Sequence, residues 1–185
     1  MIVAVADTGP LIHLDEIDAL HLLSVVDEVL IPQTVYEELE AGTVPSALDY
    51  IEYEPVEAED TGLTVELDPG ETAARNALKL VGDMRTIDVS GDAFVTSRID
   101  SGEASCVAAV REVGATFLIT DDYRALPELR EIVAVDVALS PIVLRALGTR
   151  GVLREEEAKT AFEMIAQGGD WLEAPIYRYA RQFFD

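Results

Sequence analysis

The segment at residues 2–14, "IVAVADTGPLIHL", joins two hydrophobic patterns and decides the fold class. The residues before Asp7 are small or β-branched and apolar, which is typical of a strand buried on both faces of a sheet. After Asp7, apolar side chains recur at helical spacing as far as Val26. A buried strand therefore runs directly into an amphipathic helix. We expect Asp7 at the carboxyl end of a parallel strand, where ligand sites of α/β sheets lie.

Asp7 also begins the tripeptide Asp-Thr-Gly, which carries the catalytic carboxylate of aspartic proteases. Those enzymes place the tripeptide in an all-β fold and need a second copy, from another lobe or a dimer mate. Here the tripeptide lies between a buried strand and a helix. The sequence therefore disfavours a protease.

The composition indicates one compact domain, because 49% of the 185 residues are hydrophobic. A single cysteine, Cys106, excludes an internal disulfide and a zinc site built from several cysteines. The apolar runs are too short to cross a bilayer, and the first residues do not resemble a signal peptide. We therefore expect a cytoplasmic protein.

The chain is strongly acidic, with 36 acidic and 13 basic residues and a formal net charge of −23. Only two of the basic residues, Lys79 and Lys159, are lysines, and the acids are spread along the chain. Such a bias is typical of extreme halophiles, because about 1 M salt shortens the Debye length to about 3 Å and screens self-repulsion. We expect a halophilic source; the alternative is an acidic protein that avoids nucleic acid in ordinary salt.

The rest of the chain alternates strand and helix patterns. Strands are predicted at 28–32, 115–120 and 132–138, and helices at 32–42, 45–53, 68–82, 102–114 and in three places after residue 139. The segment 86–102 is ambiguous, with short strands as one interpretation, and 121–129 turns away from the strand before it. This order predicts an α/β fold with a central parallel sheet.

Five acidic residues fall where this topology can bring distant segments to one edge of the sheet. They are Asp7, Glu38, Glu103, Asp121 and Asp122. Clustered carboxylates repel, and a hard divalent cation such as Mg²⁺ or Mn²⁺ relieves the repulsion by taking oxygen ligands. Such a cation can lower the pKa of a bound water, hold a phosphodiester and stabilise the leaving oxygen. The acids therefore predict a metal-dependent site.

Three motifs, in this order, resemble those of PIN-domain nucleases: "VADTGPLIHL", "EVLIPQTVYEELE" and "SGEASCVAAVREVGATFLITDDYRA". The resemblance is strongest to the prokaryotic branch related to VapC-type toxins, where an Asp-x-x-Pro-Leu-Ile start, a Pro-x-x-Val-x-x-Glu helix and a Gly-Glu-Ala helix recur. The tail "GDWLEAPIYRYARQFF" resembles the C-terminal helices of that branch. The family implies a three-layer α/β/α fold. It also implies a single domain over 1–185, with a less typical insert at about 55–98 and C-terminal helices at about 140–185.

The resemblance also implies an activity, a metal and partners. The family consists of endoribonucleases that depend on Mg²⁺ or Mn²⁺, often toxins that form a homodimer and are held by a small antitoxin protein. The resemblance places Asp7, Glu38, Glu103 and one or both of Asp121 and Asp122 at the metal site as catalytic acids. The expected metal ligands are Asp7, Glu103, Asp121 and Asp122, with the hydroxyls of Thr8 and Thr120 in support. The implied chemistry is in-line attack of an activated water on RNA, leaving a 5′-phosphate.

Three alternatives remain open at this point. Glu71 begins a second Gly-Glu helix and competes with Glu103, which we prefer because a clear strand follows its helix. Either Asp121 or Asp122 can be the acid after the strand. The alternative function is a catalytically silent PIN-fold interaction module.

Several other residues have less specific expectations. His13 is expected to be a packing or surface residue. The aromatic residues of the tail are expected to pack in the core or a dimer rather than stack on bases; they are Tyr177, Tyr179, Phe183 and Phe184. A group of arginines could hold RNA phosphates or balance nearby acids; they are Arg124, Arg130, Arg145, Arg150 and Arg154.

Overall fold

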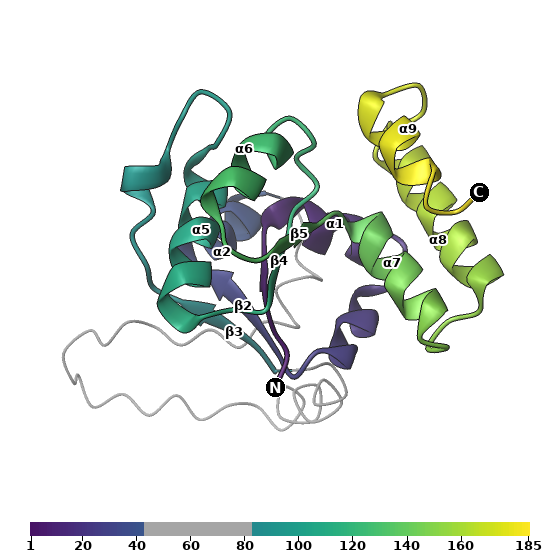
Figure 1. Cartoon of the computed structure of the whole chain (residues 1–185), viewed down its shortest axis with the longest axis horizontal. Coiled ribbons are helices and arrows are strands. Elements are labelled where there is room, and N and C mark those ends of the chain that lie inside the picture. Colours follow the sequence, from purple (N-terminus) through teal and green to yellow (C-terminus); the bar gives the residue numbers. More distant parts are fainter. Residues whose placement is uncertain (43–82) are drawn as a thin grey trace.

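A central sheet of five parallel strands, in the order β3-β2-β1-β4-β5, organises the molecule (Figure 1). The computed structural model describes residues 1–42 and 83–185. The strands are β1 (Val3–Ala6), β2 (Glu28–Pro32), β3 (Asp83–Ile87), β4 (Phe117–Ile119) and β5 (Asp136–Ala138). The predicted strands at 2–6, 28–32 and 115–120 are therefore confirmed.

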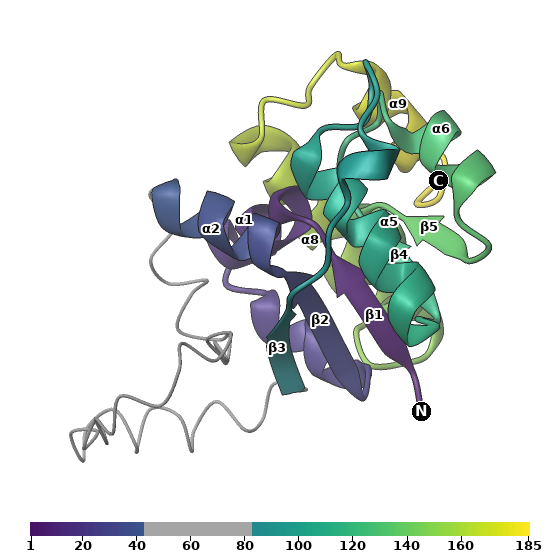
Figure 2. The same cartoon turned by 90° about the vertical axis from the view of Figure 1, so that its left-hand side faces the viewer.

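Helices cover both faces of this sheet and give three layers. Helices α5 (Ser101–Val113) and α6 (Leu126–Ile132) lie in front of the sheet in Figure 2, whereas α1 (Thr8–Glu16) and α8 (Glu155–Gly168) lie behind it. The strand order explains this division. The chain moves outward from β1 to β2 in one direction and from β4 to β5 in the other, so right-handed crossovers put the connecting helices on opposite faces. The predicted three-layer α/β/α fold with a central parallel sheet is confirmed.

The remaining helical elements surround these layers. They are η1 (Leu20–Val25), α2 (Gln33–Ala41), η2 (Asp92–Phe94), α7 (Ser140–Thr149) and α9 (Pro175–Arg181). Helix α2 contacts both α1 and α5 and so bridges the two outer layers. The helices predicted at 32–42, at 102–114 and in the tail are confirmed.

The core lies around β1, where Ala4, Val5 and Ala6 are fully buried. Burial on both faces explains why this strand reads as an unbroken apolar run instead of an alternating one. Helix α5 packs against the sheet through small residues, among them Cys106, which is buried as expected. Among the described residues, no helix is long and apolar enough to span a membrane.

The first helix is shorter than the sequence predicts. Its apolar pattern continues to Val26, but α1 ends at Glu16 and the chain resumes as the 3₁₀ helix η1. Asp18 adopts a left-handed backbone with φ of 56°, which a continuous helix excludes. The same apolar spacing serves both pieces, because each buries apolar side chains in the hydrophobic core.

Three other segments refine the sequence predictions. The segment expected to turn away after β4 contains helix α6, and the strand predicted at 132–138 shortens to β5 because residue 132 still belongs to that helix. The ambiguous segment 86–102 begins with the end of β3, contains η2 and leads into α5. The helices predicted at 45–53 and 68–82, Glu71, and most of the insert at 55–98 lie outside the described residues.

Candidate active site

All five predicted acids line one cleft at the carboxyl ends of the strands. The cleft has a volume of about 570 Å³. It lies where β1 and β4 are neighbours but lead to opposite sides of the sheet. This is the topological switch point, where the connections diverge and leave a crevice for a ligand. The acids lining the cleft are Asp7, Glu38, Asp100, Glu103, Asp121 and Asp122.

Asp7 follows β1 directly and precedes the first turn of α1. Its backbone N–H donates to the carbonyl of Ile119 at 2.9 Å, so the ladder between β1 and β4 holds it in place. Its Oδ2 accepts a hydrogen bond of 3.2 Å from the Thr120 hydroxyl, and the residue is only 7% exposed. Burial, together with the charges of Asp100 and Glu38, raises the pKa of Asp7 from 3.8 to about 7. Asp7 is therefore a carboxyl held where its charge is poorly solvated.

Glu38 reaches the same cleft from α2. Its neighbours Glu37 and Glu40 are exposed, whereas Glu38 is half-buried. The Thr8 hydroxyl donates to its Oε2 at 2.8 Å. Burial, followed by the charge of Asp100, raises the pKa of Glu38. The hydrogen bond from Thr8 shows that this hydroxyl orients Glu38, which lies thirty positions away in the sequence.

Gly102 makes this approach of Glu38 to α5 feasible. A Cβ at this position would lie 2.8 Å and 2.9 Å from the two carboxylate oxygens of Glu38. Real Cβ atoms essentially never come so close to another heavy atom. Glycine at the start of α5 therefore leaves the space in which the Glu38 carboxylate sits.

Glu103 and Asp100 form a capping box at the start of α5. The Asp100 carboxylate accepts from the Glu103 N–H at 2.9 Å, and the Glu103 carboxylate accepts from the Asp100 N–H at 2.9 Å. Glu103 is 3% exposed, and burial, with contributions from Asp122, Asp100 and Asp7, raises its pKa. The sequence prediction missed Asp100. The Asp-x-x-Glu spacing before an apolar helix is a recognisable capping-box signal that could have identified it.

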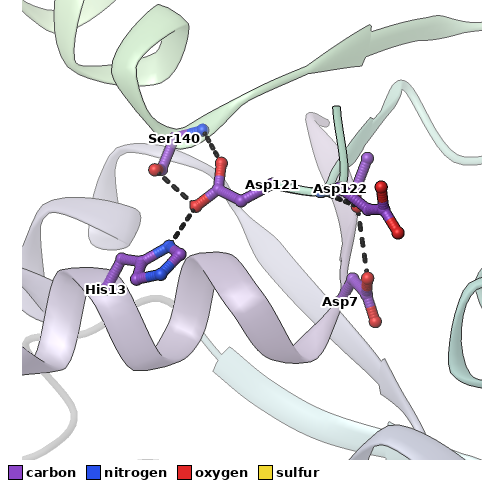
Figure 3. A network of polar contacts seen from close by, with 6 residues as sticks. Asp7, His13, Asp121, Asp122 and Ser140 are labelled. Carbon is purple, nitrogen blue, oxygen red and sulfur yellow. Dashed lines mark hydrogen bonds and ion pairs between the residues drawn. The ribbon is translucent and has the colours of Figure 1, made fainter. Parts of the chain in front are cut away.

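Asp121 points away from the other acids into a separate polar network (Figure 3). Its carboxylate accepts from the Ser140 N–H and hydroxyl, each at 2.7 Å, and lies 2.7 Å from Nδ1 of His13. The side chain is only 2% exposed. His13, predicted as a packing or surface residue, is therefore also a hydrogen-bond partner of Asp121; its ring packs edge-on against Trp171.

Asp122 lies on the other side of the strand end, toward Asp7 (Figure 3). Its Oδ1 accepts from the N–H groups of Arg124 at 2.8 Å and Ala125 at 3.1 Å. These bonds shape the turn into α6 and fix the direction of the side chain. The two adjacent aspartates thus have different surroundings.

The donor chemistry of the cleft fits a hard divalent cation. Six acids line it, and the basic residues among the described lining are Arg124 and His13, of which His13 is paired with Asp121. Burial raises the pKa of Asp7, Glu38 and Glu103, and the charges of neighbouring carboxylates raise it further. Within residues 1–42 and 83–185, however, no group of three or more His, Cys, Asp or Glu side chains is arranged to hold a metal. The residue types therefore suit a divalent metal, but the described side chains are not preorganised as a set of metal ligands.

Comparison with known proteins agrees with the fold. Residues 3–90 match the family model described as "DUF3368: PIN domain". The match supports the PIN-domain family, and the five-stranded parallel sheet is consistent with the PIN-like α/β/α fold. PIN domains are generally nucleases, so a nuclease-type function is indicated. No curated protein and no solved structure matches the chain.

Proposed function

We propose that this protein is an endoribonuclease that depends on Mg²⁺ or Mn²⁺ and hydrolyses RNA phosphodiesters. The observation that carries the proposal is the convergence of Asp7, Glu38, Glu103 and Asp122 from four separate segments on one cleft. Burial and neighbouring acids raise the pKa of three of these carboxyls, and a bound divalent cation would favour their ionised forms.

The proposed ligands of the cation are Asp7, Glu103 and Asp122. Asp122 is preferred to Asp121, because His13 and Ser140 already engage both carboxylate oxygens of Asp121. A bound divalent cation supplies an activated water and neutralises charge on the phosphodiester. Glu103 is preferred to Glu71 because Glu103 lines the cleft. The absence of a clear strand after Glu71 is no longer a reason for this preference, since β3 forms there.

Hydroxyl groups of this chain orient two of the carboxylates. Thr8 holds Glu38 and Thr120 holds Asp7 by direct hydrogen bonds. Because these donors favour the ionised forms, they oppose the effect of burial and keep the oxygens directed. Both threonines are therefore positioning residues in the proposed site.

The resemblance to the VapC-type branch supports a role as the toxin of a toxin–antitoxin pair. In this role a homodimer would be held by a small antitoxin protein. The chain itself would be a single PIN-like domain, located in the cytoplasm of a halophilic organism. The net charge of −23 supports the halophilic source, since high salt screens self-repulsion.

The test is cleavage of a mixed RNA pool with Mn²⁺ in concentrated KCl. Wild type should release 5′-phosphate ends, and both Asp7→Asn and Glu38→Gln should abolish this release. Glu40→Gln is the matched control, because Glu40 lies on the same helix but is exposed. Equal activity of wild type and Asp7→Asn would refute the proposal.

One observation favours the second candidate, a catalytically silent interaction module: the described side chains are not preset around a metal. Titration calorimetry with MnCl₂ separates the two candidates. The nuclease should bind Mn²⁺ and lose this binding in Asp7→Asn. Absence of both binding and cleavage in wild type would establish the silent module.

A further inference from the structure

The aromatic residues of the tail divide into two sets with different surroundings. Tyr177 and Phe184 stack on the buried ring of Phe162, with centroid distances of 5.5 Å and 4.8 Å. They pack against the core, as the sequence predicts. Tyr179 and Phe183 instead contact each other at 5.4 Å. Tyr179 is partly buried against the core, but its ring contacts are with Phe183 and Tyr123 and not with Phe162.

The second set continues into the loop that carries the acids. The ring of Tyr123 lies 5.4 Å from that of Tyr179, and Tyr123 directly follows Asp122. We call Tyr123, Tyr179 and Phe183 the aromatic strip. Tyr123 and Phe183 at its two ends are each 36% exposed, so part of each ring is accessible to a ligand.

The aromatic strip is continuous with the acidic cleft. Tyr123 lines the cleft itself, and so do Pro175 and Ile176 from the first turn of α9, the helix that carries Tyr179. In both Figure 1 and Figure 2, α6 and α9 lie at the top of the molecule, on the side to which the strands lead. Tyr123 therefore belongs to both the acidic cleft and the aromatic strip and joins the two.

Arginines accompany the aromatic strip in an otherwise acidic chain. Arg130 donates to the Tyr179 hydroxyl at 2.8 Å, and its guanidinium carbon lies 5.8 Å from the ring centroid. Arg124 lines the cleft next to Tyr123. No acid in the part of the chain that the structure describes forms an ion pair with either arginine. By contrast, Arg154 is paired with Glu157.

We infer that the aromatic strip binds unstacked bases of single-stranded RNA whose backbone enters the acidic cleft, an inference that rests on the proposed nuclease function. Every base has a π-face, so exposed aromatic rings bind single strands with little sequence preference. Bases in a duplex are already stacked on one another and are not available in this way. Arg124 lines the cleft, where its guanidinium can contact phosphates, whereas Arg130 is already hydrogen-bonded to Tyr179. The strip supplies affinity that this acidic protein cannot obtain from its net charge.

Fluorescence anisotropy with a short labelled single-stranded RNA of mixed sequence tests the inference. EDTA prevents cleavage, so binding is measured alone. Tyr123→Leu and Tyr179→Leu should each raise the Kd by about 5- to 150-fold, the range for loss of one stacked base. The loss should persist in about 1 M KCl, because stacking is not ionic whereas phosphate contacts weaken with salt. A duplex RNA of the same sequence should bind weakly and equally to all variants.

Two control variants separate stacking from general damage. Tyr123→Phe keeps the ring and should bind like wild type. Phe94→Leu removes another aromatic–arginine pair, with Arg111 4.6 Å from the ring, and should change the Kd less than about twofold, within the usual effect of a remote substitution. It lies on η2, on the opposite side of the molecule from α9 in Figure 1. Thermal unfolding checks each fold; if Tyr179→Leu does not fold, Tyr123→Leu alone decides, since its residue is partly exposed.

The outcomes distinguish this inference from the proposed function. Unchanged RNA binding in Tyr123→Leu overturns the inference even when wild type cleaves RNA. A change of oligomeric mass with unchanged RNA binding also overturns it and makes the aromatic strip a protein interface. Weakened binding in the leucine variants, with no cleavage by wild type in Mn²⁺, supports the strip and refutes the nuclease.

Discussion

Asp121 and Asp122 are adjacent in the sequence, yet their surroundings differ: buried carboxylates have hydrogen-bond donors around Asp121 and acidic neighbours around Asp122. In the network of Asp121, every oxygen meets a donor: two groups of Ser140 and the ring of His13. In the cleft of Asp122, the carboxyls of Asp7 and Glu103 are buried beside other acids, and their pKa values are raised. The first region holds segments together. The second retains charges that destabilise the fold, which is expected where a ligand completes the site.

The largest expected effect on stability comes from removing the Asp121 carboxylate from its hydrogen-bond network. Asp121→Ala leaves His13 and both groups of Ser140 without their acceptor, so the free energy of unfolding should fall by about 3–5 kcal/mol. Urea titration in concentrated KCl measures the change. The exposed Asp136→Ala is the control and should shift stability by less than about 0.5 kcal/mol. Equal losses in the two variants would contradict a special role for Asp121.

A gain in stability is expected from Asp7→Asn in the metal-free protein. The folded-state pKa of Asp7 is raised to about 7, so the native state keeps a proton that the unfolded chain has already released. Stability therefore falls as pH rises from about 4 to about 7, and the cost, at most about 4 kcal/mol, is complete above that range. Asn carries no charge and avoids this cost.

Urea unfolding in EDTA at acidic and alkaline pH measures this difference. Asp7→Asn should exceed wild type in stability at alkaline pH, and the two should converge in acid. A variant that is less stable than wild type at alkaline pH would show that the Asp7 charge is satisfied without a cation.

Adding Mn²⁺ should reverse the order of these two proteins. A ligand that binds only the folded state stabilises it by about 2.7 kcal/mol at a hundred times its Kd. Wild type should therefore gain in melting temperature with rising MnCl₂, most strongly at alkaline pH, where the acids ionise. Asp7→Asn should gain little. Parallel gains in both proteins would mean that Mn²⁺ binds elsewhere.

The smallest effect on stability, but a clear one on activity, is expected from Gly102→Ala. The added Cβ would meet the carboxylate of Glu38 at 2.8–2.9 Å, and this flexible group can move away. Alanine also favours the helix over glycine by about 0.5–1 kcal/mol, so stability should stay nearly constant. Cleavage should fall by about tenfold or more, as for a displaced supporting group. Unchanged cleavage would remove Glu38 from the catalytic set.

Much of the fold and of the acidic set could be predicted from the sequence. The apolar run before Asp7 predicts a doubly buried strand, and such strands with intervening helices require a parallel sheet. Parallel strands end at one edge, so acids that follow β1 and β4 had to approach one another. Local pattern could not reveal the break at Asp18, because each piece keeps an apolar side toward the core. It also left Asp100 unnoticed, although the capping-box spacing was present.

The sequence by itself therefore determined the α/β class and the meeting of distant acids, because both follow from periodicity and the direction of strands. Only the tertiary structure decided what each side chain does there. His13 and Ser140 meet Asp121 across separations of 108 and 19 positions, and they turn it away from Asp122. The same holds for the aromatic tail. Tyr177 contacts Phe162, whereas Tyr179 contacts Tyr123, and only the tertiary structure reveals this division. Such contacts depend on residues that the fold brings together from distant parts of the chain, so no local sequence pattern predicts them.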